Sequence, residues 1–91
     1  SIDYCVTIKT NFMYTLTIIR LNSETRVFEN TEFNGCETEG GVYNEISSYG
    51  CPIEQLEKFK ALQKGDRMTA ESDITNGIKR GLRFFYINRI S

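Results

Sequence analysis

The stretch that is most informative about the fold runs from Leu62 to Ile90 and reads LQKGDRMTAESDITNGIKRGLRFFYINRI. It opens with a helix end and a Lys64-Gly65-Asp66 turn, because glycine accepts the left-handed conformation that ends many helices. Arg67 to Thr75 then alternates in the manner of a strand, and Leu82 to Ile90 is rich in aromatic and β-branched residues. Between them, Asn76-Gly77 is the preferred pair for a tight type I′ turn. The stretch therefore predicts a helix followed by a closing β-hairpin.

Three strand-like segments precede this stretch. Tyr4 to Lys9 alternates with a period of two, and Met13 to Leu21 is dominated by β-branched and aromatic residues. Arg26 to Phe33 reads as a third strand, with a bend or bulge expected at Glu29-Asn30. From Asn34 to Gly50 the sequence contains four glycines and is expected to be mostly loop.

One helix is predicted from about Pro52 to Gln63. Proline suits the first helical position, and Glu54 and Glu57 favour the positive end of the helix dipole. The apolar stripe of this helix comprises Ile53, Leu56, Phe59 and Leu62. The predicted order is βββαββ, within a single domain that spans residues 1–91.

Composition places the chain among ordinary globular proteins. Apolar residues make up 40% and charged residues 25% of the sequence. No apolar run reaches the roughly 18 to 20 residues that span a bilayer, and the N-terminus lacks a basic region followed by an apolar block. These features predict a cytoplasmic protein without a membrane partner.

The sequence carries no pattern typical of an enzyme or a metal site. It contains no histidine, and Cys5, Cys36 and Cys51 are too widely spaced for a zinc tetrad. Each cysteine is interpreted as a small buried hydrophobic residue, and one disulfide with a free thiol is the alternative. No nucleophile elbow, phosphate loop or catalytic carboxylate pair is evident, so neither enzymatic activity nor a cofactor is expected.

Charge is distributed unevenly along the chain, although the net charge is −1. Residues 1–57 contain three basic and nine acidic side chains, and residues 58–91 contain eight basic and three acidic ones. A basic region on a nearly neutral protein is compatible with contact to a phosphate backbone, because local potential attracts a polyanion.

The order βββαββ resembles the OB-fold, a small five-stranded Greek-key barrel with one helix between strands three and four. The segment LQKGDRM, followed by a hairpin and a strand that ends in isoleucine, resembles the close of bacterial single-stranded DNA-binding proteins of that fold. The chain departs from them in having no tryptophan, no acidic C-terminal tail and a short first strand. The resemblance therefore implies a small, specialised binder of the kind that a phage or mobile element encodes.

Such a protein binds single-stranded DNA or RNA through cations that contact phosphates and flat side chains that stack on bases. Phe85, between Arg83 and Arg89, is expected to face outward as a stacking platform. For every aromatic candidate, Phe85 included, core packing is the competing interpretation. The positions that match the ligand-binding strands and loops of the OB-fold are Lys9, Phe12, Tyr14, Arg20, Arg26, Phe28, Lys79, Arg80, Arg83 and Phe85.

The alternative function is that of a small acidic protein-interaction module or inhibitor that docks on a nucleic-acid-processing enzyme. Its acidic residues are Glu29, Glu32, Glu37, Glu39 and Glu45. A replication or host protein is thus a second class of partner. A homodimer is a further expectation, because Arg83 to Ile90 could form an exposed edge strand, and such strands commonly pair.

Overall fold

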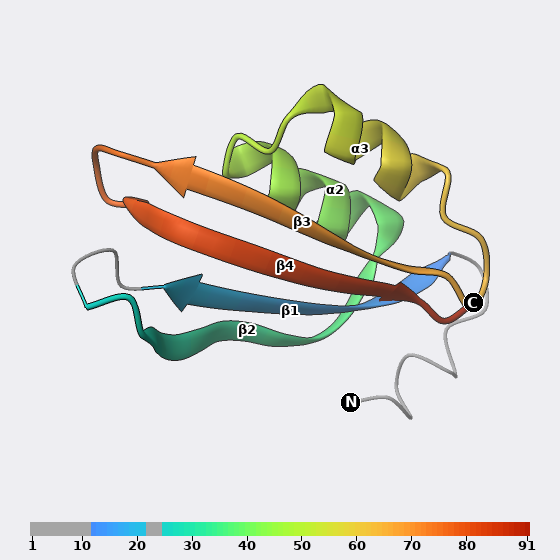
Figure 1. Cartoon of the computed structure of the whole chain (residues 1–91). Helices are drawn as coiled ribbons and strands as arrows, with labels where there is room; N and C mark the ends of the chain where they lie inside the picture. The colour runs from blue at the N-terminus through green and yellow to red at the C-terminus, as the bar shows by residue number, and fades with distance from the viewer. Residues whose placement is uncertain (1–11, 22–24) are drawn as a thin grey trace.

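The computed structural model describes residues 12–21 and 25–91, in which strands and helices follow in the order ββααββ. The strands form one antiparallel sheet with the order β2-β1-β4-β3, and both helices lie on the same face of it (Figure 1). The elements are β1 (Met13–Leu21), β2 (Phe28–Thr38), α2 (Glu39–Ser48), α3 (Ile53–Lys60), β3 (Arg67–Ile74) and β4 (Gly81–Arg89).

The predicted five-stranded barrel is wrong. The sheet of the described residues is open, because β2 and β3 occupy its opposite edges and each pairs with a single neighbour. A closed barrel would bury apolar side chains in its interior, whereas this sheet buries them beneath two helices. The predicted first strand, Tyr4 to Lys9, lies outside the described residues.

Helix α2 occupies a region that the sequence analysis assigned to a loop because of its glycines. The side chain of Thr38 caps the helix, with its Oγ1 accepting a hydrogen bond of 3.1 Å from the backbone N–H of Gly41. Val42 and Ile46, four residues apart, are both fully buried. A Cβ at Gly41 would meet only the end of the flexible Glu37 side chain, which can move aside. The burial of Val42 and Ile46 therefore accounts for the helix better than the glycine does.

Other predicted elements are confirmed in outline. Strand β1 has the predicted limits, and α3 lies within the predicted helix. The sheet register shifts between Ile18 and Ile19 and again between Arg20 and Leu21, and the second shift coincides with the bulge predicted at Glu29-Asn30. The predicted hairpin joins β3 to β4, but residues 75–80 connect the strands in place of a two-residue turn. Gly77 still has the positive φ of 93° for which glycine is suited.

The core lies between the sheet and the two helices. Strand β4 alternates so that Phe85 and Ile87 are buried towards the helices, whereas Phe84 and Tyr86 lie on the other face. The exposed fraction is 0% for Phe85 and 41% for Tyr86. The core cluster comprises Tyr14, Leu16, Ile18, Val42, Ile46, Cys51, Leu56, Phe59, Leu62, Ala70, Phe85 and Ile87.

Strand β4 is a central strand, since it pairs with β1 on one side and β3 on the other. The exposed edge expected for Arg83 to Ile90, on which the prediction of a homodimer depended, is therefore absent. Cys51 is free and buried, as a small hydrophobic residue would be. Cys36 is instead disulfide-bonded.

Neither helix of the described residues is long and apolar enough to cross a membrane. Within the same residues, no group of histidine, cysteine and acidic side chains is arranged to hold a metal ion.

Candidate nucleic-acid interface

The face of the sheet opposite the helices is not covered by any described element (Figure 1). Cross-strand pairing defines which residues share this face, because directly opposed residues project on the same side. One row places Thr69, Tyr86, Thr17 and Asn34 side by side. The next row contains Glu71, Phe84, Ile19 and Thr31. We refer to this surface as the uncovered face.

Aromatic side chains are concentrated on the uncovered face over the central strands. Phe28 of β2 and Phe84 of β4 meet edge to face, with ring centroids 5.8 Å apart. Strand β1 lies between their strands, so the two rings pack together above it. Phe28 is 52% exposed, and Tyr86 lies two residues beyond Phe84 on the same face. These three rings give the uncovered face an accessible aromatic surface.

Basic residues gather at the end of the sheet where β1 ends and β2 and β4 begin, since Leu21 pairs with both Phe28 and Leu82. We call this part of the molecule the hairpin end. Of its basic residues, Arg26, Lys79 and Arg80 are exposed and Arg20 is half-buried. Four of the predicted phosphate-contacting residues are thus brought together from distant parts of the sequence.

Arg83, also at the hairpin end, is buried and already paired. Its Nε donates to Oε2 of Glu32 at 2.8 Å, and its Nη2 donates to Oε1 at 3.3 Å. The guanidinium also donates to the backbone carbonyl of Lys79 and lies 4.6 Å from the ring centre of Tyr49. Only 4% of Arg83 is exposed, so its charge supports the fold and does not face solvent.

Arg20 lies directly opposite Arg83 on the neighbouring strand, on the helix side of the sheet. Its Nε is buried without a hydrogen-bond partner, and its side chain lies against the backbone of Gly81. Among the described residues, no carboxylate forms an ion pair with Arg20. This uncompensated charge adds to the positive potential of the hairpin end.

Two of the predicted stacking residues lie in the core. Tyr14 and Phe85 are 1% and 0% exposed, and the Tyr14 ring packs 4.9 Å from that of Phe59. Burial raises the pKa of Tyr14, and the nearby Glu39 carboxylate, which accepts a bond from the hydroxyl, adds to the effect. Neither ring can reach a base while the helices cover the sheet.

The remaining predicted aromatic, Phe12, is half exposed but lies at the end of the sheet remote from the hairpin end. The guanidinium of Arg89 stacks 3.7 Å from its ring centre, so one side of the ring is occupied. Lys9 lies outside the described residues.

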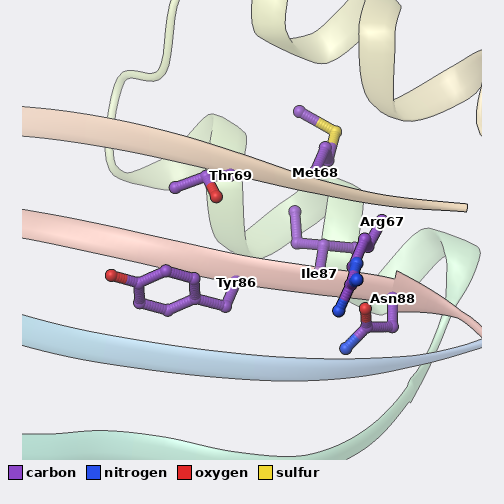
Figure 2. A pocket seen from close by; sticks show the side chains of 6 residues that line it. All are labelled: Arg67, Met68, Thr69, Tyr86, Ile87 and Asn88. Carbon is purple, nitrogen blue, oxygen red and sulfur yellow. The ribbon is translucent and has the colours of Figure 1, made fainter.

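A shallow depression lies beside Tyr86 between β3 and β4 (Figure 2). Its volume is about 360 Å³, and it is lined by Arg67, Met68, Thr69, Tyr86, Ile87 and Asn88. Arg67, Thr69, Tyr86 and Asn88 are exposed residues of the uncovered face. The depression therefore combines a flat ring with a cation, a hydroxyl and an amide.

Sequence reasoning missed Phe84 and Tyr86 as surface aromatics, and Tyr49 as a partner of the basic residues. Both faces of β4 are apolar, so its alternation did not indicate which face was exposed. Tyr49 lies in the segment assigned to a loop, and its ring contacts Lys79 at 4.7 Å as well as Arg83. No signal in the local sequence identifies that contact.

Three of the acidic residues named for the alternative function have side chains that lie against other parts of the protein. Glu32 neutralises Arg83, and Glu39 accepts the hydrogen bond from Tyr14. The side chain of Glu37 lies against Gly41. Two of these carboxylates, those of Glu32 and Glu39, are therefore engaged within the protein, which leaves less acidic surface for a basic partner than the sequence suggested.

The fold and this surface define an α+β protein with an open antiparallel sheet, helices on one face and aromatic side chains on the other. Comparison of the chain with family models, with curated proteins and with solved structures gives no match. The function is therefore argued from the surface itself.

Proposed function

We propose that this protein is a non-enzymatic, sequence-tolerant binder of single-stranded nucleic acid, and that it binds the strand across the uncovered face. The proposal rests on one observation, which is that accessible rings of the uncovered face lie near the exposed cations of the hairpin end. The rings are Phe28, Phe84 and Tyr86.

Single-stranded nucleic acid needs both kinds of group, because cations contact phosphates and planar side chains stack on unpaired bases. A four-stranded sheet with aromatic residues on its open face is a known solution to this requirement in RNA recognition. Stacking contributes about 1 to 3 kcal/mol per base, so two or three rings are sufficient for useful affinity at low salt.

Charge on the uncovered face favours one path for the strand. The acidic residues Glu71 and Asp73 lie on β3 at the edge of the sheet, opposite Phe84 and Leu82. Phosphates are repelled from this half of the β3 edge, so near the hairpin end the strand is expected to run over β1 and β4. Asn34 and Thr31 on β2 add no charge to this path.

The test is fluorescence anisotropy of a labelled oligothymidine at low salt. The double variant Lys79→Glu, Arg80→Glu reverses two exposed cations of the hairpin end. The matched control is Lys58→Glu, Lys64→Glu, which changes net charge equally at exposed positions on α3 and in the connection to β3.

We expect the hairpin-end variant to bind more weakly and the control to bind nearly as the wild type does. If both phosphate contacts are lost, the slope of log affinity against log salt becomes shallower by about 1.4. Equal losses in the two variants, or no binding by the wild type at micromolar protein, would refute the proposal.

A further inference from the structure

The depression beside Tyr86 has the chemistry of a subsite for a single nucleotide. Its volume of about 360 Å³ lies at the lower end of the range of about 300 to 1,000 Å³ found for small-ligand sites. Tyr86 is 41% exposed, and among the described residues its ring has no aromatic or cationic partner. A planar ring that projects from a central strand without a partner is available for stacking.

The side-chain amide of Asn88, which lies near this ring, is oriented by a hydrogen bond. Asn88 Nδ2 donates to Thr15 Oγ1 at 3.1 Å, which orients the amide. Within residues 12–21 and 25–91, its Oδ1 and second N–H have no other partner, so they can pair with a donor and an acceptor on the edge of a base. Such paired contacts are how asparagine recognises bases in nucleic-acid complexes.

Arg67 supplies positive charge at the rim of the depression, directly opposite Asn88 on the neighbouring strand. Its side chain is exposed, and no carboxylate of the described residues forms an ion pair with it. A guanidinium that these residues leave without a carboxylate partner can bind a phosphate through two parallel hydrogen bonds.

We propose that this depression binds one unpaired nucleotide, with its base stacked on Tyr86, the base edge on Asn88 and its 5′-phosphate on Arg67. The inference rests on the proposed function, because it assigns one nucleotide of the bound strand to a defined place. It also predicts that a mononucleotide binds there without the hairpin end.

The experiment uses NMR of the full chain labelled with ¹⁵N, titrated separately with thymidine 5′-monophosphate, thymidine and deoxyribose 5-phosphate. The side-chain amide resonances of Asn88 are expected to shift with the two ligands that contain a base. They should not shift with the sugar phosphate, which lacks the stacking group.

Three variants separate the contributions of the ring and the cation. Tyr86→Ala is expected to weaken binding of both base-containing ligands by about 5-fold or more, the equivalent of one stacked base. Tyr86→Phe should retain binding, since it keeps the ring. Arg67→Glu should weaken thymidine 5′-monophosphate but leave thymidine within about twofold, because neutral thymidine has no phosphate.

The subsite is refuted if no resonance of the depression shifts, or if Tyr86→Ala binds the mononucleotide as the wild type does. In either case oligothymidine can still bind through the hairpin end, and the proposed function stands. If oligothymidine fails to bind while the mononucleotide shifts Asn88, the proposed function fails and the subsite remains.

Discussion

Phe85 and Tyr86 are adjacent in β4 but differ completely in their surroundings. Phe85 is fully buried beneath the helices, and its ring lies 5.5 Å from that of Tyr49. Tyr86 is on the uncovered face, where its cross-strand neighbours are Thr17 and Thr69. We predict that replacing each by alanine separates stability from binding.

The magnitude for Phe85→Ala comes from the cavity that truncation leaves in the core, which costs about 3 to 5 kcal/mol for a buried phenylalanine. A chain of this length has a total stability of about 5 to 14 kcal/mol. The variant should therefore lose a large share of its stability, and its Tm should fall by about 12 to 40 °C. Tyr86→Ala loses only cross-strand contacts on an exposed face, so its cost should stay below about 1 kcal/mol.

Urea denaturation followed by circular dichroism measures both free energies of unfolding. The midpoint for Phe85→Ala should fall by at least about 1 M, with little change in the slope. In the oligothymidine assay, Tyr86→Ala should lose affinity, whereas Phe85→Leu, a milder core variant, should retain it while folded. If Tyr86→Ala proved as destabilising as Phe85→Ala, the assignment of the two faces of β4 would be refuted.

Three further predictions test local features of the fold. Gly81 has a φ of 127°, and a Cβ there would lie 2.9 Å from Arg20 Nε, so Gly81→Ala should destabilise the protein by about 1 to 3 kcal/mol in the same urea assay. Glu32→Gln leaves the charge of buried Arg83 uncompensated; because Glu32 is itself partly exposed, a loss of about 1 to 3 kcal/mol is expected, and an unchanged midpoint would contradict the pairing. Burial raises the pKa of Cys51 to about 11, so at pH 9 iodoacetamide should alkylate it far more slowly in the native protein than in urea. In the unfolded chain this thiol loses its proton above about pH 8.5, whereas in the folded protein it stays protonated up to about pH 11. The free energy of unfolding should therefore decline as pH rises from about 8.5 towards 11.

Local patterns were sufficient for elements whose signals lie within a few residues. β-Branched residues predicted β1 with its observed limits, and the apolar stripe placed α3. Helix α2 was missed because Gly40 and Gly41 lower helix propensity, and local sequence does not report the burial of Val42 and Ile46 that offsets this cost.

The candidate nucleic-acid interface was likewise only partly predictable from the sequence. Sequence alone identified Arg26 as a cation of the third predicted strand and Lys79 and Arg80 as cations of the last hairpin, and it could not establish that they lie at the same end of the sheet. That proximity depends on the pairing of β1 with β4, which joins residues far apart in the chain. The barrel prediction failed for a related reason, because strand order alone does not specify whether a sheet closes.

The amino-acid sequence was sufficient to locate most strands, one helix and the basic character of the last third of the chain. Which face of β4 is buried depends on contacts between residues far apart in the sequence. Arg83 and Arg89 suggested that the Phe85 face was exposed, but Glu32, 51 residues away, neutralises Arg83 inside the protein. Burial of a charge depends on a partner that the fold supplies, and Phe85 faces inward because the two helices cover that side of the sheet and bury its ring in the core.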